Sequence, residues 1–347
     1  VGINAMEPAL FGIADGSIIM SWTEPDGTGF AVKTATLQGG NWSRPVTITT
    51  SNSLFVNWAD FPTVAAFNDG TLAVSWLQEN TNIPYAYDIN IALSSDAGQT
   101  WGSPIVPHDD QSTRQHGFLT LLPTERDEMI AVWLDAREYN SQSPGDSFGN
   151  AVQLRSTTIG KDGTLGKDIP LDLRACSCCQ TSAAITEDGT VLIAYRDRTA
   201  DEIRDISIVR RHNGVWSGPV NVHADGWEIS GCPVNGPAID AQATNAVVAW
   251  FTGADNIATI KVAFSEDSGV TFGPAFQVDS GESVGRVGTL MLATGDALIS
   301  WVEWTSDGEM LILCRATKND GCVARQTITE HAAAGSFNFP KLARSGD

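Results

Sequence analysis

The chain has 347 residues, of which 42% are hydrophobic and only 18% are charged, below the roughly 25% of charged residues in an average soluble domain. Lys and Arg number 21 against 41 Asp and Glu, so the formal net charge is −20 at pH 7. A nucleic-acid-binding surface needs a basic footprint, and an anionic membrane surface repels such a chain. We therefore expect no nucleic acid and no membrane as partner, and no segment approaches the roughly 18 apolar residues of a membrane span.

The sequence starts at Val1, with neither a Met nor an apolar signal segment before it. This start fits a targeting peptide that has been removed, or a trimmed sequence. The six cysteines, an even number, fit an oxidising compartment. We expect a secreted or periplasmic protein that is a monomer.

Six apolar runs recur along the chain, each of which follows a turn and ends in an aromatic residue. The aromatic residues are 54, 57, 62, 55 and 51 residues apart. Each run is followed by a second short β-type run and a polar turn, often with Asp-Gly or Asn-Gly, which is the strongest short hairpin signal. The six aromatic residues are Trp22, Trp76, Trp133, Tyr195, Trp250 and Trp301.

A period of about 55 residues with about four short strands is typical of one propeller blade. Six such units close a ring without exposed sheet edges, whereas a β-sandwich with extra hairpins does not explain six copies at nearly even spacing. The sequence therefore predicts an all-β fold, a six-bladed β-propeller with about four antiparallel strands per blade. We expect a single domain over residues 1–347.

Two of the polar turns carry a more specific motif. Residues 94–101 read SSDAGQTW and residues 265–272 read SEDSGVTF, which match the Asp-box pattern S-x-D-x-G-x-T-W/F. The chain thus resembles the sialidase-like propellers with the bacterial neuraminidase repeat. The resemblance implies a structural role for the box, in which Asp accepts backbone N–H groups and Gly takes a left-handed conformation. It also implies that the box lies on the face away from the usual active site.

Four further segments resemble a bacterial subgroup of these sialidase-like proteins that has no secure activity. They are NWADFP at 57–62, CSCCQT at 176–181, YRDRTADEIRDI at 195–206 and GCPVNGP at 231–237.

In a propeller, the loop that leads into the innermost strand of each blade opens at the mouth of the central channel. We call these segments the leading loops, and we expect them to ring one pocket, because concave sites with a few convergent polar groups are the usual ligand sites. The six leading loops are residues 5–8, 57–60, 114–117, 176–180, 231–235 and 284–286.

Four of the six cysteines and one histidine fall in these loops. Thiolates with an imidazole suit a soft or borderline ion, so one interpretation is a metal-binding or redox-active pocket with one Cu or Zn ion. The alternatives are disulfides that pin these loops, for example from the fourth of these cysteines to one of the first three, a bridge between the adjacent pair, or plain buried thiols. The spacing does not choose among them. The predicted ligands are His116, Cys176, Cys178, Cys179 and Cys232.

The other two cysteines, Cys314 and Cys322, flank the polar turn of one hairpin. Facing positions across such a turn bring their Cβ atoms near disulfide range. We therefore expect a structural disulfide here, without a function of its own.

A second interpretation is a carbohydrate-active enzyme, a glycoside hydrolase of sialidase-like fold. The resemblance implies three arginines, a Tyr nucleophile, a Glu and an Asp acid/base. The family's Arg-Ile-Pro motif is absent, since the first leading loop reads Met6-Glu7-Pro8. Only one of the candidate arginines, Arg286, lies in a leading loop; the others are Arg137, Arg196, Arg198 and Arg204. The sialidase machinery is therefore incomplete. The catalytic candidates are Asp60, Glu228 and Arg286, and the ligand-binding candidates are Asn57, Trp58, Arg196 and Asn235.

The ligand would accordingly be a small molecule, a glycan or a metal ion, and the sequence leaves binding and catalysis as alternatives. Arg196 lies in the alternately charged run 195–206, which is also typical of a salt-bridged loop. Asp60 equally suits a turn carboxylate.

Overall fold

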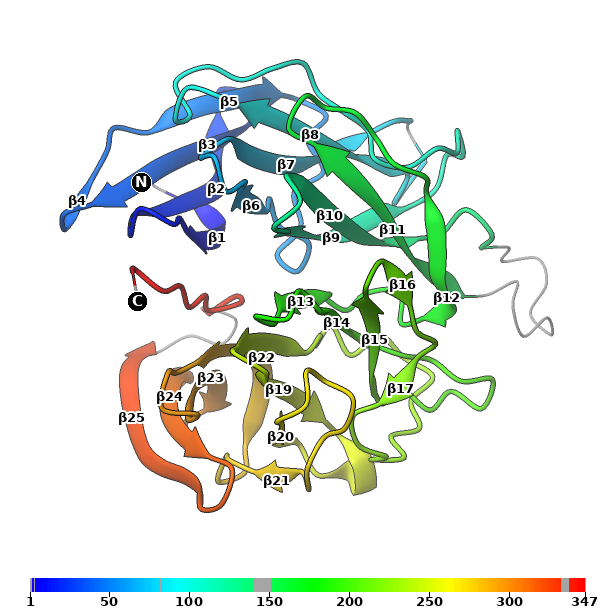
Figure 1. Ribbon diagram of the computed structural model, residues 1–347, viewed down its shortest axis with the longest axis vertical. Helices are drawn as coiled ribbons and strands as arrows, with labels where there is room; N and C mark the ends of the chain where they lie inside the picture. The colour runs from blue at the N-terminus through cyan, green and yellow to red at the C-terminus, as the bar shows by residue number, and fades with distance from the viewer. Residues whose placement is uncertain (1, 3, 82, 140–150, 332–336, 347) are drawn as a thin grey trace. The chain divides into compact units, whose positions relative to one another are not determined.

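The computed structural model describes residues 2, 4–81, 83–139, 151–331 and 337–346. These residues form six antiparallel sheets in which neighbouring strands follow one another along the chain (Figure 1). The only helical segment within them is a single 3-10 turn, Ala254–Asn256, and it is far too short to cross a membrane. The predicted fold class is confirmed: the protein is all-β, with the six blades of a β-propeller.

The chain divides into two compact units, residues 1–173 with 343–347 and residues 174–342. Each unit holds three blades and is described by itself. In the first unit, blade 1 consists of β1 (Met6–Gly12), β2 (Ile18–Asp26), β3 (Gly29–Gln38), β4 (Asn41–Trp42) and β5 (Val46–Ser51). Blade 2 consists of β6 (Val64–Ala66), β7 (Leu72–Glu79) and β8 (Tyr87–Ser94), and blade 3 of β9 (His116–Pro123), β10 (Glu128–Asp135), β11 (Val152–Gly160) and β12 (Ile169–Ala175).

In the second unit, blade 4 consists of β13 (Ser182–Ile185), β14 (Val191–Arg196), β15 (Ile206–His212), β16 (Val215–Trp216) and β17 (Val220–Asn221). Blade 5 consists of β18 (Ala238–Gln242), β19 (Asn245–Thr252), β20 (Thr259–Ser265) and β21 (Phe276–Gln277). Blade 6 consists of β22 (Ser283–Met291), β23 (Ala297–Trp304), β24 (Glu309–Thr317) and β25 (Gly321–His331).

Blade 2 departs from the four-strand pattern. Its fourth strand is reduced to an isolated bridge between Ile91 and Ile105. Pro104 and Pro107 flank the bridge, and a proline has no N–H group to donate to a strand ladder.

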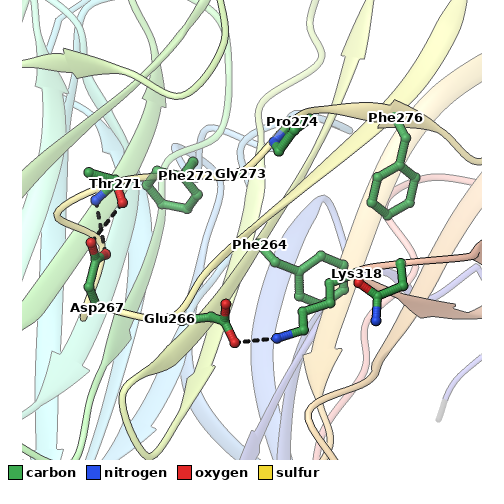
Figure 2. A pocket seen from close by; sticks show the side chains of 10 residues that line it. Phe264, Glu266, Asp267, Thr271, Phe272, Gly273, Pro274, Phe276 and Lys318 are labelled. Carbon is green, nitrogen blue, oxygen red and sulfur yellow. Dashed lines mark hydrogen bonds and ion pairs between the residues drawn. The ribbon is translucent and has the colours of Figure 1, made fainter.

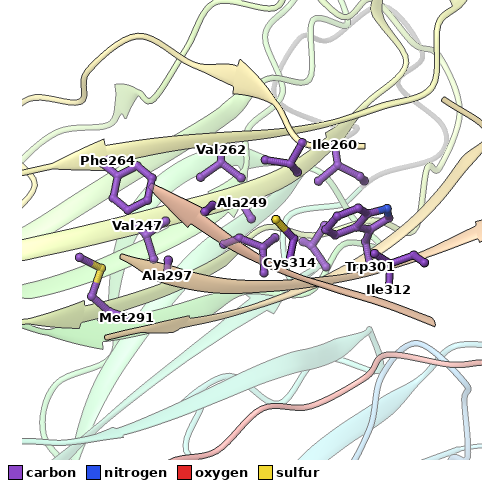
Figure 3. Close-up of a cluster of buried hydrophobic side chains, with 14 residues drawn as sticks. Val247, Ala249, Ile260, Val262, Phe264, Met291, Ala297, Trp301, Ile312 and Cys314 are labelled. Carbon is purple, nitrogen blue, oxygen red and sulfur yellow. The ribbon is translucent and has the colours of Figure 1, made fainter. Parts of the chain in front are cut away.

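All six repeat aromatic residues lie on the second strand of their blades, as the period predicts, and all are buried. Apolar residues on both sides of that strand then pack between neighbouring blades. In the second unit, a cluster that includes Trp301, Val247, Ile260 and Cys314 fills the space between blades 5 and 6 (Figure 3). Burial of apolar area of this kind is the main stabilising contribution to such a fold.

Each sheet has two ends along the direction of its strands. We call the end at which the first strand of a blade begins the leading edge. We call the opposite end, where the third strand turns into the fourth, the turn edge. Residues 94–101 and 265–272 lie at the turn edges of blades 2 and 5. They make the same hydrogen bonds, since Asp96 and Asp267 both accept from a backbone N–H and a threonine hydroxyl four residues later. These bonds lower the pKa of both carboxyls.

Three blades share a β-bulge near the leading edge. In blades 1, 3 and 6, two residues of the first strand face one tryptophan of the second strand. The indole N–H donates in each blade to a carboxylate two residues further on, at 2.8, 2.8 and 2.7 Å. Each bulge holds one residue with positive φ, a conformation that costs about 1–3 kcal/mol in a non-glycine residue. These three residues are Glu7 (60°), Phe118 (55°) and Arg286 (57°).

Candidate functional site

The leading loops 5–8, 57–60 and 114–117 belong to the first unit, and the loops 176–180, 231–235 and 284–286 belong to the second. The site residues predicted from the sequence are therefore divided between two units. A single pocket that holds His116 together with the cysteines stays a prediction.

Glu7, Asp60 and Tyr87 form a buried cluster at the leading edges of blades 1 and 2. Asp60 Oδ1 accepts from the backbone N–H of Phe118 at 2.8 Å, and Asp60 Oδ2 accepts from the Tyr87 hydroxyl at 3.3 Å. Glu7 Oε1 is buried and has no hydrogen-bond partner among the described residues. Bulges re-aim side chains next to functional sites, and here the bulge carries Glu7 toward Asp60.

Burial raises the pKa of both carboxyls, because it disfavours the charged form. The pKa of Glu7 rises to about 8, with a smaller contribution from the nearby Asp60, and the pKa of Asp60 rises to about 7. The small cavity beside them holds about 10 Å³, roughly the space of one water molecule. At neutral pH the Glu7 carboxyl is therefore largely protonated and the Asp60 carboxyl partly protonated, and the cavity beside them has room for one water.

Aromatic side chains surround this acid cluster. The ring of Phe55 stacks on Tyr87 at 4.0 Å and meets the exposed Tyr85 edge-on at 6.1 Å. The turn above Asp60 is held by Asn57, whose side chain accepts from Ala59 N–H and whose carbonyl accepts from Asp60 N–H. Trp58, at the tip of that turn, is 44% exposed.

A second buried polar network lies at the leading edges of blades 2 and 3. His116 is fully buried, with Nε2 at 3.0 Å from Asp110 and Nδ1 at 3.3 Å from Asp88. Burial alone would lower the pKa of His116, but the hydrogen bonds to Asp110 and Asp88 outweigh it and raise the pKa to about 9. His116 is therefore an imidazolium at neutral pH. His108 stacks on it with ring centroids 3.7 Å apart and planes 3° from parallel.

Histidines and aspartates this close together could in principle hold a metal ion. An imidazole nitrogen binds a metal in the plane of its ring at about 2.0–2.1 Å, and one ion cannot lie in the planes of two parallel rings 3.7 Å apart. On the other side of His116, Arg137 already supplies the positive charge, with Nη2 at 2.8 Å from Asp135 and 3.3 Å from Asp110. This arrangement does not fit a metal ion with His116 as ligand.

In the second unit, Cys178 and Cys232 form a disulfide with Cα atoms 6.1 Å apart. This is one of the alternatives that the sequence left open, and it removes both residues from the set of thiolate ligands. Cys176 and Cys179 are free and buried. The predicted hairpin disulfide between Cys314 and Cys322 is confirmed.

The two free thiols lie close together, with their Sγ atoms 3.2 Å apart. Two thiolates on one tetrahedral zinc, at about 2.3 Å each, would hold their sulfurs about 3.8 Å apart. The pair therefore fits a sulfur–sulfur hydrogen bond better than a metal. The prediction of a bound Cu or Zn ion stays a prediction, and neither cluster of donor atoms supports it.

Cys176 lies in a positively charged environment. Arg204 Nη1 donates to its Sγ at 3.4 Å. The hydrogen bond from Cys179 lowers the pKa of the Cys176 thiol most, and Arg196 and Arg204 add to the effect, so that the pKa falls to about 6. Burial raises the pKa of Cys179 instead. Cys176 is thus a thiolate and Cys179 its thiol donor at neutral pH.

The remaining predicted residues of the second unit have mainly backbone partners. Arg196 is buried and donates to the carbonyls of Asn235, Arg204 and Phe251. Asn235 Oδ1 accepts from Arg286 N–H at 2.8 Å, and the Arg286 guanidinium lies 3.5 Å from the buried Glu309. Glu228 is exposed and forms a backbone bridge with Ile203.

A larger cavity lies at the turn edge of the second unit rather than at a leading edge. It has a volume of about 530 Å³, and the rings of Phe264, Phe272 and Phe276 line it. Figure 2 shows Glu266 paired with Lys318 and Asp267 bonded to Thr271 beside these rings. None of the residues predicted for the site lines it.

Sequence reasoning missed Glu7 and Tyr87 as parts of the acid cluster, and Asp88, His108 and Asp110 as partners of His116. The sequence does contain a signal for the bulge that positions Glu7. The three bulged blades share the pattern Trp-x-Glu or Trp-x-Asp, at Trp22, Trp133 and Trp301. The partners of His116 come from a strand start and from the irregular segment before β9, which no repeat places.

No protein-family model matches the sequence, and no curated protein sequence is significantly similar to it. Similar solved structures exist. The BP39L lectin from Burkholderia pseudomallei matches with a TM-score of 0.61 at 13% identity, over 96% of this chain and 89% of the lectin. The Hadza microbial sialidase Hz136 matches with 0.51 at 17% identity, over 86% of this chain and 63% of the sialidase. The α-L-arabinanase of Penicillium chrysogenum matches with 0.51 at 13% identity, over 94% of both chains.

Identities this low show a common fold and no more. The resemblance to sialidase-like propellers that the sequence motifs indicate is thus matched by the structure, and the chain is similar in fold to sialidases and to a propeller lectin.

Proposed function

We propose that the protein is a carbohydrate-active propeller that binds a glycan at the leading edge of blade 2 and uses the Glu7–Asp60 pair as a proton donor. The observation that carries the proposal is the position of Asp60. Its carboxyl has a pKa of about 7 and lies at the base of a turn whose tip exposes Trp58. A carboxyl that is still protonated near neutral pH is what general acid catalysis on a glycosidic oxygen requires.

The exposed aromatic side chains support a glycan as the ligand. Trp58 and Tyr85 are 44% and 66% exposed, and rings of this kind offer an apolar face to the C–H groups of a sugar together with a polar atom for its hydroxyls. The lectin, the sialidase and the arabinanase of similar fold all carry carbohydrate-related names. The one-water cavity beside Asp60 is too small for a sugar and suits a proton transfer through water.

A panel of immobilised neutral and acidic polysaccharides, followed by chromogenic glycosides, tests the proposal. We expect at least one glycan to bind, and Trp58→Ala to weaken that binding at least tenfold. Trp42→Ala is the matched control, because Trp42 is 47% exposed in β4 at the turn edge of blade 1. The proposal fails if no glycan binds, or if both tryptophan variants lose the same affinity.

The acid role is tested separately. Asp60→Asn keeps an oxygen that accepts from Phe118 N–H but holds no proton to donate, so we expect it to bind the glycan and to lose any hydrolysis. Glycan binding with no hydrolysis in the wild type would leave a lectin and overturn the acid role.

The two disulfides fit an oxidising compartment, which supports a secreted or periplasmic location as part of the proposal. That the protein is a monomer stays a prediction. The copper or zinc site predicted from the sequence is tested by metal analysis of the purified protein under reducing and oxidising conditions. We expect less than one ion per chain in both.

A further inference from the structure

The leading edge of the second unit brings a buried dithiol and a surface disulfide together. Cys176 and Cys179 are 1% and 2% exposed. The disulfide between Cys178 and Cys232 lies outside them, with Cys178 half-buried and Cys232 exposed. One oxidised and one reduced pair of cysteines therefore occupy one site.

The distances allow the two pairs to exchange. Cys176 Sγ lies 3.8 Å from Cys178 Sγ, which is one end of the disulfide, and 3.2 Å from Cys179 Sγ. Thiol–disulfide exchange proceeds by attack of a thiolate on a disulfide sulfur, and 3.8 Å is close to the contact distance of two sulfur atoms. The first unit contains no cysteine, so all of this chemistry belongs to the second.

The charges around Cys176 favour the attacking form. Arg204 donates to its Sγ at 3.4 Å. Arg204 also pairs with Glu202 at 2.8 Å. Arg196 is buried nearby, and within the described part of the chain its guanidinium donates to backbone carbonyls and to no carboxylate. Buried positive charge without a carboxylate partner stabilises an adjacent thiolate.

We propose that Cys176, Cys178, Cys179 and Cys232 form a thiol–disulfide exchange switch, in which the buried dithiol takes over the disulfide from the surface pair. In the first step, the Cys176 thiolate attacks Cys178 Sγ; the Cys178–Cys232 bond breaks, and Cys232 leaves as a thiolate that takes a proton from water. In the second step, Cys179 attacks Cys176 Sγ, the Cys176–Cys178 bond breaks, and the proton of Cys179 passes to Cys178, which leaves as a thiol. One disulfide is broken and one is formed, so no external oxidant or reductant is consumed.

The exchange changes how a leading loop is held. The disulfide ties loop 231–235 to loop 176–180 across 54 residues of sequence. After exchange, the hydrogen bonds of Asn235 to Arg196 and Arg286 still hold the end of the loop, while Cys232 at its start is released. The switch thus controls whether loop 231–235 is tied to loop 176–180, and it does not depend on the proposed glycan site in the first unit.

Trapping of the released thiol tests the switch. Folded protein without reductant is incubated at pH 8 with iodoacetamide, quenched in acid, labelled with a second reagent after denaturation and mapped by mass spectrometry. We expect alkylated Cys232 together with a Cys176–Cys179 disulfide. Cys176→Ser should slow the alkylation of Cys232 at least tenfold, since nothing then attacks the disulfide. The Cys314–Cys322 disulfide should stay intact throughout and thereby exclude unfolding.

Cys179→Ser supplies a second readout that does not rely on the folding of Cys176→Ser. It blocks only the second step, so alkylated Cys232 should then accompany a Cys176–Cys178 disulfide. The proposal is overturned if wild-type protein keeps the Cys178–Cys232 bond while Cys176 and Cys179 are alkylated. It is also overturned if Cys232 is alkylated at the wild-type rate in folded Cys176→Ser, or if Cys179→Ser gives no Cys176–Cys178 disulfide.

Discussion

Asp60 and Asn235 occupy equivalent places in the two units. Each lies in a leading loop and accepts a hydrogen bond at 2.8 Å from a backbone N–H in the first strand of the next blade, Phe118 for Asp60 and Arg286 for Asn235. Each donating N–H belongs to a bulge residue with positive φ, which follows a glycine. An amide suffices for this structural role in the second unit.

The difference between the two residues indicates where chemistry is to be sought. Asn235 accepts the hydrogen bond of the Arg286 N–H as a neutral amide, and its Nδ2 donates to the carbonyl of Val284. Asp60 accepts the equivalent hydrogen bond from the Phe118 N–H. Its group is a buried carboxyl next to Tyr87 whose pKa is raised to about 7. Because burial of a charge costs stability, an acid at this place points to a use for its proton.

The first prediction tests the role of Asn235 as an acceptor through Gly285, the glycine that precedes Arg286. A Cβ atom at Gly285 would lie 2.2 Å from Asn235 Oδ1, and φ at Gly285 is +97°. We expect Gly285→Ala to lower the free energy of unfolding by roughly 2–6 kcal/mol, from backbone strain and from the loss of the acceptor of Arg286 N–H. Denaturant unfolding measures the loss.

Gly281→Ala is the matched control. Its φ is +100°, but nothing lies within 4 Å of the added Cβ, so only the backbone strain of about 1–3 kcal/mol should appear. Equal losses in the two variants would show that the contact with Asn235 contributes nothing.

The second prediction concerns the charge of Asp60. Its pKa in the folded protein, about 7, lies above the ordinary aspartate value of 3.8, so the folded state binds the extra proton and stability falls as pH rises from about 4 to about 7. Asp60→Asn removes this dependence. Relative to wild type, the variant should gain up to about 4 kcal/mol between pH 4 and pH 8, from about three pKa units.

Thermal unfolding across that range measures the gain, and Asp201→Asn, at an exposed position, serves as the control. A constant difference between Asp60→Asn and wild type from pH 4 to pH 8 would mean that Asp60 is ionised throughout.

Much of the fold could be predicted because each blade repeats one local requirement. An aromatic residue such as Trp133 or Trp250 must be buried on the second strand, and a polar turn must follow, so the period appears directly in the sequence. The hairpin disulfide between Cys314 and Cys322 could also be predicted, because both residues flank one turn. They are not register partners, however, since Cys314 pairs with Arg325 and Cys322 with Ala316. The loss of the fourth strand in blade 2 could not be predicted from the repeat, because it depends on the prolines around Ile105, which leave a single bridge there.

The candidate site could be predicted only in part. The leading loops were found from topology, and Asp60 and Asn235 among them do make contacts between blades. The bulges were missed, because an extra residue in a strand depends on pairing partners rather than on the residue itself. The role of Glu7 was missed for this reason. Which cysteine pairs with Cys232 depends on loop geometry that spacing alone does not fix.

The smallest predicted effect isolates the contact between Tyr87 and Asp60. The Tyr87 hydroxyl donates to Asp60 Oδ2 at 3.3 Å and lowers the pKa of that carboxyl. Tyr87→Phe should therefore raise the pKa of Asp60 above about 7. At pH 5, where Asp60 is protonated with or without the hydroxyl, we expect little loss of stability. At pH 8, where the hydroxyl helps to hold a carboxylate, the loss should reach about 1 kcal/mol.

A double-mutant cycle with Asp60→Asn assigns that pH dependence, because it should vanish when position 60 cannot ionise. Tyr85→Phe is the control, since Tyr85 is exposed and contacts Phe55 by its ring. A loss in Tyr87→Phe that is the same at pH 5 and pH 8 would locate its effect in packing against Phe55, and Asp60 would then differ from Asn235 through burial alone. A loss that grows with pH, and only while Asp60 is present, would show that a specific hydrogen bond from Tyr87 stabilises the Asp60 carboxylate.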